Sequence, residues 1–364
     1  MDSWTTLDTH CRQSRLSLSR PIIDPNCQRA LVPEYPFESL RRRRASVRAR
    51  SRYLLRTDLS RFYHSIYTHA ISWALHNKAI VKARRRDLTL LGNRLDKILR
   101  EGQDGQTLGI PVGPDASLLI AEVVLTAVDS RLTVGNSING FRHYDDFELG
   151  FEGPDEAEAT LASLQAHLAE YEMSLNPEKT DVLILPAPID RPWVSALRDA
   201  TFRDTEKGQE MDLFRYFESA IQLAKAFSED PVLSYALSRL RPLKILPAVA
   251  PVYQDLVLQF VLAEPGALSY GVFELTREEL NGHSVDRDKL HSCLESILKR
   301  HSLAQHGSEV AWALYVALLF ELKISDDAAR NISALRDSVV ALLALDCKSS
   351  PDHSRKVRTE EPPA

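Results

Sequence analysis

Two adjacent carboxylates, Asp145 and Asp146, lie in the segment GFRHYDDFELG between aromatic and apolar residues. Adjacent carboxylates repel each other, so an ionised pair in such surroundings needs a cation, for which Mg²⁺ or Mn²⁺ is suited. Asn139 and Gly140 form a turn signal before residues that favour strands, and the pair is therefore expected at the bend of a β-hairpin. The plainer interpretation is a polar hairpin tip, because Asp-Asp pairs are common in turns.

A third carboxylate, Asp58, is near the end of a strand expected over 53–59, in YLLRTDLSRFY. An apolar, helix-like stretch follows, and a lone carboxylate at this position can simply cap that helix. The chemical alternative is nucleotidyl transfer, which uses two divalent metals ~4 Å apart clamped by carboxylates. Asp58 on one strand and the pair on a neighbouring hairpin can converge in that way, and this requires them to lie within metal-bridging reach.

Two further stretches can contact a phosphate. A glycine- and proline-rich loop, GIPVGP, ends where a helix is expected to begin at Asp115, and such a loop presents backbone amides to phosphate or lets a nucleotide approach closely. After a second helix expected from Pro154, SLNPEKTDVLILP turns into a strand over 181–185, with Lys179 in the turn. Most loop lysines are only solvated.

A chain of 364 residues can hold two domains, or one large domain with an appendage, and 44% hydrophobic residues supply ample core. The net charge is -5. The charge is uneven, because the segment 41–56 contains eight arginines and no acidic residue. Such a run is commonly a solvated face or a disordered arm, but phosphate responds to local patches of this kind. A second basic segment, expected to be helical, occupies 77–100.

The four cysteines are far apart and no signal peptide is evident, so a cytoplasmic location is expected. The longest apolar run, 310–320, is shorter than the ~20 residues that span a bilayer, and a buried helix is expected instead of a membrane segment. Residues 1–40 are polar and broken by prolines, and periodicity does not place them. From Asp212 onward the pattern predicts helices throughout, arranged as stacked hairpins without a fixed repeat length.

Taken in order, DLSRFY, GIPVGPDAS, HYDD and LNPEKT resemble motifs A to D of the reverse transcriptase family over about 53–185, with a fainter match to the fingers region in RPIIDPNCQ. Details such as IYTHAISWALH, GQDGQT and EVAWAL look most like the bacterial abortive-infection and defence-associated unknown groups. The resemblance implies an α+β fold: a palm with an antiparallel sheet and short fingers, followed by an all-α helical-repeat domain. The expected domains are partial fingers and a basic segment at 1–52, the palm at 53–203, the helical domain at 204–347 and a disordered tail at 348–364.

The resemblance also assigns roles to single residues. Asp58, Asp145 and Asp146 are expected as catalytic metal ligands, and Lys179 as the lysine that protonates or steadies the leaving pyrophosphate. The expected nucleotide-binding residues are Phe62, Tyr63, Gly113 and Arg52. Of these, Tyr63 or its neighbour Phe62 matches the ring under the sugar, for which the plainer interpretation is core packing.

Gly113 would let the template or the incoming base approach. Arg52, with Arg44, Arg48 and Arg50, would contact the triphosphate or the template backbone. Two positions depart from the family pattern: Val112 replaces the usual glutamine of motif B, and His143 replaces the tyrosine two residues before the aspartate pair.

The leading hypothesis is an RNA-directed or untemplated DNA polymerase that uses Mg²⁺ or Mn²⁺ and dNTPs, binds nucleic acid as template or product, and acts in antiphage defence. Self-assembly through the helical domain is a further expectation. The alternative is a catalytically weak or inactive nucleic-acid-binding scaffold with the same fold. A glycosidase is disfavoured because its two carboxylates must face each other across a cleft, which adjacent residues cannot easily do.

Overall fold

The computed structural model describes residues 3–37, 39–135 and 137–349, so most of the expected tail lies outside the described residues. The chain forms two compact units that divide between Ile189 and Asp190. The sequence placed the start of the helical domain at 204. Helix α9 (Pro192–Arg198) already belongs to the second unit, because Trp193 and Leu197 are buried in that unit's core.

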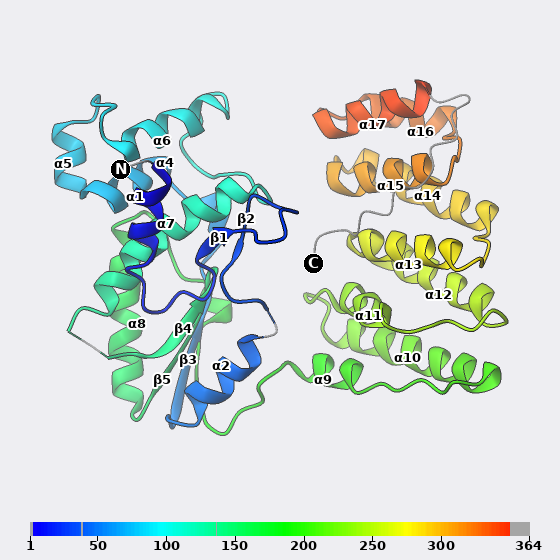
Figure 1. Cartoon of the computed structure of the whole chain (residues 1–364), viewed down its shortest axis with the longest axis horizontal. Helices are drawn as coiled ribbons and strands as arrows, with labels where there is room; N and C mark the ends of the chain where they lie inside the picture. Colours follow the sequence, from blue (N-terminus) through cyan, green and yellow to red (C-terminus); the bar gives the residue numbers. More distant parts are fainter. Residues whose placement is uncertain (1–2, 38, 136, 350–364) are drawn as a thin grey trace. The chain divides into compact units, whose positions relative to one another are not determined.

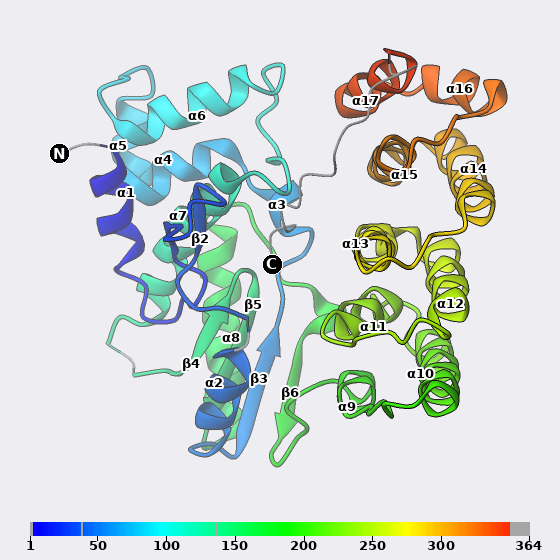
Figure 2. The ribbon, with the colours of Figure 1, turned by 45° about the vertical axis from the view of Figure 1, so that its right-hand side comes forward.

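The first unit is built on a four-stranded antiparallel sheet with the strand order β4-β5-β3-β6. Figure 1 labels β3, β4 and β5, and Figure 2 also labels β6. Its strands are β3 (Tyr53–Thr57), β4 (Asn139–His143), β5 (Asp146–Phe151) and β6 (Asp181–Ile184). Successive side chains of a strand point to opposite faces, and here both faces are covered. Leu54 packs in a cluster with residues of α2 (Ser39–Arg48), whereas Leu55 packs with α7 (Asp115–Leu132) and α8 (Pro154–Ala169), and both leucines are fully buried.

Residues 1–40, which periodicity did not place, form short elements held by distant parts of the chain. They contain α1 (Ser3–Cys11), β1 (Pro21–Ile23) and β2 (Leu31–Pro33), the two strands pairing antiparallel. The backbone of Leu18 donates to the carbonyl of Arg142 at 2.8 Å, beside the edge strand β4. The rest of the first unit comprises α3 (Phe62–Ser65), α4 (Thr68–His76), α5 (Lys78–Ala83), α6 (Leu91–Glu101) and the 3-10 turn η1 (Pro177–Lys179).

The described residues of the second unit are helical, as the sequence predicted. After α9 come α10 (Glu206–Ala226), α11 (Val232–Leu240), α12 (Ala250–Ala263), η2 (Pro265–Ala267), α13 (Leu268–Leu280), α14 (Arg287–Leu303), α15 (Gly307–Leu319), α16 (Asp326–Ser333) and α17 (Ser338–Ser349). Figure 2 shows two layers, one of odd-numbered and one of even-numbered helices, each helix packing on the next of its own layer. The expected α+β fold followed by an all-helical region is confirmed.

Apolar residues between the two helical layers form one continuous core, which includes Phe217, Tyr253 and Phe260. The apolar run 310–320 lies in α15, where Val310 and Leu314 are fully buried in this core. No helix in the described part of the chain combines the length and the apolar character needed to cross a membrane.

Candidate active site

The carboxylates meet at one end of the sheet because of strand register. β3 pairs with β5 so that Thr57 faces Phe147, which places Asp58, the residue after β3, beside the β4–β5 turn. That turn consists of Tyr144 and Asp145, and Asp146 is the first residue of β5. Tyr144 has a left-handed backbone, with φ of 53°. The hairpin expected from the sequence, with the aspartate pair at its bend, is therefore present.

The electrostatics of the site indicate an excess of negative charge. Burial raises the pKa of Asp145 to about 7, and the nearby charges of Asp58 and Asp146 and a hydrogen bond with Asp58 add to the rise. Burial and the charge of Asp58 also raise the pKa of Asp146, with Lys179 and Arg44 opposing. Three oxygen-donor groups that resist joint ionisation match a hard divalent cation in kind and charge. The oxygens of Asp58, Asp145 and Asp146 do not all lie within 4.8 Å of one another. Among the described residues, only one cluster of potential metal ligands has that spacing, and it is in the second unit.

Lys179 is fixed against Asp58. It ends η1, and its Nζ donates to Oδ2 of Asp58 at 2.6 Å. The turn is held in place because the side chain of Asn176 accepts from the Glu178 backbone, while the Asn176 backbone donates to the Asp58 carbonyl at 2.7 Å. The hydrogen bond to Asp58 raises the pKa of Lys179, so the lysine is a cation beside the carboxylates.

Of the two neighbouring rings, Tyr63 is the one beside the carboxylates. Burial raises the pKa of Tyr63 to about 12, and the charges of Tyr144 and Asp145 add to the effect, which places its hydroxyl near the turn. Phe62 is 5% exposed and packs in the core of the first unit. The structure thus gives Phe62 the plainer role of core packing, and its expected contact with nucleotide is not supported by its position.

The glycine-rich loop runs beside Tyr63. The backbone of Ile110 donates to the Tyr63 carbonyl at 2.9 Å, and that of Gly109 to the Ile66 carbonyl at 2.9 Å. Gly109 has φ of 85°, a conformation that favours glycine, and a Cβ there would make a tight contact of 3.2 Å with the His64 carbonyl oxygen.

Gly113 is exposed, with φ of 111°, in the part of this loop next to α7. Asp115, in the first turn of α7, ties the loop to the β1–β2 connection. Its carboxylate accepts from the backbones of Ala30 at 2.9 Å and Leu31 at 3.1 Å, and it forms an ion pair with Arg29. The β1–β2 connection and the loop therefore form one assembly.

Two arginines of the basic segment pair with a carboxylate of β5 outside the aspartate pair, although Arg44 is near enough to Asp146 to oppose the rise in its pKa. Arg44 and Arg48 form ion pairs with Glu148, which is buried on β5. Arg52 lies at the opposite end of β3, where its backbone donates to the Phe151 carbonyl and its exposed side chain is 3.8 Å from a Glu152 oxygen. Five strand residues of about 3.3 Å each separate it from Asp58. Arg52 thus lies at the end of β3 away from the carboxylates, and its contact with a nucleotide stays a prediction.

A buried charge cluster beneath the turn was missed by the sequence analysis. The guanidinium of Arg142 is fully buried and binds the carboxylates of Glu122 and Asp129, both on α7. Burial alone would lower the pKa of Arg142, but the two carboxylates raise it above its ordinary value. Its Nη1 also donates to the Tyr144 carbonyl at 2.7 Å, while Ser19 Oγ accepts from the Tyr144 backbone at 2.8 Å.

This cluster fixes the turn that carries Asp145. The signal that could have found it is the spacing of seven between Glu122 and Asp129, which puts two carboxylates on one face of an otherwise apolar helix.

A cavity of about 620 Å³ lies elsewhere in the first unit, near α1, β1, β2 and α2. None of the site carboxylates lines it. Its lining includes Arg12, Arg15, Arg20, Arg42 and Arg43. Arg20 is neutralised by Asp8 and Glu34, but the cavity still has more basic than acidic side chains.

An antiparallel sheet that carries carboxylates on adjacent strands at one end is the arrangement of a polymerase palm. The family described as "Reverse transcriptase (RNA-dependent DNA polymerase)" matches residues 9–216, more than half of the chain. The chain belongs to the reverse transcriptase family. The activity named in that family's description is RNA-dependent DNA polymerisation, which is a nucleotidyl transfer.

Solved structures similar to the chain include two telomerases. One is telomerase from Candida albicans in complex with a TWJ fragment of telomeric RNA, with 13% identity, a TM-score of 0.31, and coverage of 86% of this chain and 50% of that one. The other is apo telomerase from Candida tropicalis, with 10% identity, a TM-score of 0.34, and coverage of 95% and 57%. The chain thus spans about half the length of these solved chains. No curated protein matches it.

Proposed function

We propose that the chain is a divalent-metal-dependent DNA polymerase that adds dNTPs to the 3′ end of a primer. The observation that carries this proposal is the convergence of Asp58 and Asp145 at one end of the sheet, with the cation Lys179 on Asp58. Without a bound metal, the negative charge of the three carboxylates exceeds the positive charge of Lys179. Nucleotidyl transfer needs additional positive charge to neutralise the phosphates.

In this proposal Asp58, Asp145 and Asp146 hold Mg²⁺ or Mn²⁺, which supplies charge neutralisation to the phosphates and activates the primer hydroxyl. Lys179 holds a proton at Nζ, where a leaving pyrophosphate can take it. Tyr63, half-buried beside the turn, lies where a ring can support the sugar and exclude a 2′-hydroxyl. Arg142 is a positioning residue: its hydrogen bond to the Tyr144 carbonyl fixes the turn that carries Asp145.

The nucleic-acid partner is an RNA template, a DNA product, or both. The arginine-lined cavity supports binding of a phosphodiester backbone, which is attracted by local basic patches whatever the net charge. Gly113 is exposed beside the tied β1–β2 connection, where a template base can approach the backbone closely.

A finer part of the proposal is that this activity serves antiphage defence in the cytoplasm. It is supported by the sequence details shared with the defence-associated groups and by a helical stack after the palm. The stacked helices also offer an extended surface for self-assembly. Plaque counts on bacteria that express the chain or its Asp145→Asn variant test the defence role, and equal counts would remove it without affecting the polymerase proposal.

The decisive experiment is incorporation of labelled dNTPs by the full chain with Mg²⁺ or Mn²⁺, with and without an RNA template. Asp145→Asn with Asp146→Asn should abolish incorporation, whereas Asp155→Asn, an exposed carboxylate on α8, should not. Dependence on the template separates reverse transcription from untemplated synthesis. No incorporation by a folded chain under any condition would leave a nucleic-acid-binding scaffold.

A further inference from the structure

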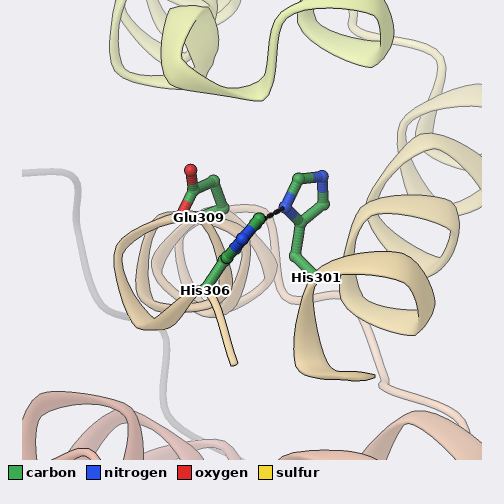
Figure 3. A group of neighbouring side chains, drawn as sticks. All are labelled: His301, His306 and Glu309. Carbon is green, nitrogen blue, oxygen red and sulfur yellow. Dashed lines mark hydrogen bonds between the residues drawn. The ribbon is translucent and has the colours of Figure 1, made fainter. Parts of the chain in front are cut away.

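Three potential metal ligands converge at the junction of α14 and α15 in the second unit. His301 is in the last turn of α14, His306 directly precedes α15 and Glu309 is in the first turn of α15 (Figure 3). One donor atom from each lies within 4.8 Å of the other two, and within the described ranges this is the only group of three or more that does so.

The spacing of the two imidazoles fits a tetrahedral metal site. Nδ1 of His301 and Nδ1 of His306 are 3.0 Å apart. With Zn–N bonds of about 2.0–2.1 Å, two nitrogens on a tetrahedral zinc are separated by roughly 3.3 Å. For a metal to replace the hydrogen-bonded proton, the two nitrogens need to separate by only a few tenths of an ångström, and both rings must turn so that their lone pairs converge on the metal.

The end of α14 sets this geometry before any metal binds. The backbone of His306 donates to the His301 carbonyl at 3.0 Å, and Gln305 has φ of 58°, so a tight left-handed turn returns the chain toward the last helical turn. A ligand set that the fold has already assembled loses little entropy on binding.

The donor types select a transition metal. Imidazole nitrogens with one carboxylate suit Zn²⁺, whereas Mg²⁺ prefers oxygen ligands such as those of the palm. His301 is buried, so its imidazole is shielded from water on the side of the helical core. The carboxylate of Asp337 lies so close to Gly307 that a Cβ added to this glycine would be 2.3 Å from Oδ2 of Asp337. Asp337 therefore adds negative charge beside the three ligands.

We propose that His301, His306 and Glu309 bind one Zn²⁺ ion that joins α14 to α15. His306 is exposed and Glu309 half-buried, so the fourth position of the metal faces water. The ion stabilises the helical unit by binding its folded form. This inference does not depend on the proposed polymerase activity.

The test is zinc stoichiometry and affinity of the full chain, measured by equilibrium dialysis with metal analysis, and the visible spectrum with Co²⁺ in place of Zn²⁺. We expect one Zn²⁺ per chain to be lost, or bound at least about tenfold more weakly, in His306→Ala and in Glu309→Gln. The matched control is His291→Ala, an exposed histidine of α14 that contacts the Lys323 carbonyl and should leave zinc binding unchanged.

Zinc should also raise the unfolding temperature of the helical unit in the original chain but not in the two variants. All of these chains keep the palm carboxylates and the cysteines, so zinc bound there cancels in the comparison. Circular dichroism checks that the variants fold. Equal zinc binding by the original chain and a folded His306→Ala, Glu309→Gln double variant would overturn the proposal, and so would binding of no zinc at all.

Discussion

The Nζ atom of Lys179 lies 2.6 Å from Oδ2 of Asp58. The two side chains differ in exposure, since that of Lys179 is 58% exposed and that of Asp58 only 9%. A flexible, solvated lysine is thus held in one place by a buried carboxylate, and that place is the end of the sheet where the other carboxylates meet. Its proton is available where phosphates would bind.

Lys179→Met should lower kcat for dNTP incorporation by at least about 100-fold, which is the lower limit of the usual contribution of a general acid to the rate. The Mg²⁺ concentration needed for half-maximal rate should not increase, because the lysine no longer competes with the metal for Asp58. Steady-state incorporation across a Mg²⁺ titration separates the two effects.

Lys82→Met is the matched control, because Lys82 is an exposed lysine on α5, and its kcat should equal that of the original chain. Undiminished kcat in Lys179→Met would assign the lysine to structure alone.

Tyr63→Ala should make the enzyme accept ribonucleotides. Removing the ring opens space beside the sugar, and the ratio of kcat/KM for dGTP over GTP should fall roughly tenfold or more. Tyr63→Phe keeps the ring and should keep the ratio. Single-nucleotide incorporation on a primed template gives both values.

Phe62→Ala tests the distinction between the neighbouring rings. Because Phe62 is buried in the core, the substitution should cost about 3–5 kcal/mol of stability and leave the dGTP-to-GTP ratio unchanged. A changed ratio in Phe62→Ala with an unchanged ratio in Tyr63→Ala would reverse the assignment.

The stability of the metal-free chain should depend on pH through Asp145. Its pKa in the folded chain is about 7, above its ordinary value of 3.8, so the folded state binds this proton more tightly than the unfolded state. The contribution is therefore full below about pH 4 and is lost as pH rises toward 7. Urea midpoints at pH 5 and pH 8 in EDTA should show lower stability at pH 8.

Asp145→Asn should flatten the dependence of the urea midpoint on pH. Mg²⁺ should raise the urea midpoint of the original chain more at pH 8 than at pH 5, because metal and proton compete for the same carboxylate oxygens. Identical pH profiles of the two chains in EDTA would contradict the assignment of the slope to Asp145.

Arg142→Met should destabilise the first unit by about 3–5 kcal/mol, because it removes the cation from the buried carboxylates of Glu122 and Asp129. Hydroxyl donors such as Ser14, which is 2.6 Å from Asp129, remain but carry no charge. Hydrogen exchange of peptides from β4, β5 and α7 should show the loss, while peptides of the second unit remain unchanged.

The triple variant Arg142→Met, Glu122→Gln, Asp129→Asn removes the unpaired charges and should recover part of the stability. Its polymerase activity should remain low, because nothing then holds the Tyr144 carbonyl. Full activity of the triple variant would show that the cluster serves folding only.

Local pattern predicted the parts of the site that depend on neighbours in sequence. The strand-forming residues around the aspartate pair predicted the β4–β5 hairpin, but Asn139 and Gly140, interpreted as a turn signal, lie within β4, and the turn is formed by Tyr144 and Asp145. The α7 start follows from the proline before Asp115. The position of Asp58 beside Asp145 depends on the register between β3 and β5. The order of the motifs suggested that the two residues come together, but only the observed antiparallel pairing gives the register.

Tertiary packing decided the rest. From the sequence alone, Phe62 and Tyr63 are equally good candidates for the ring beside the sugar. The direction of the short helix α3 buries Phe62 in the core and leaves Tyr63 in the site. Arg52 was close to Asp58 along the chain, but an extended strand separates them in space. The elements within residues 3–37 are positioned in part by distant partners, such as the Arg142 carbonyl, which no local sequence pattern reveals.

Helix α7 carries Asp115 in its first turn and Glu122 and Asp129 farther along. Its 18 residues measure about 27 Å. One helix therefore carries the carboxylate that holds the β1–β2 connection and the two carboxylates that hold Arg142 beneath the Asp145 turn. A substitution that shifts α7 along its axis should disturb the glycine-rich loop and the turn with Asp145 together.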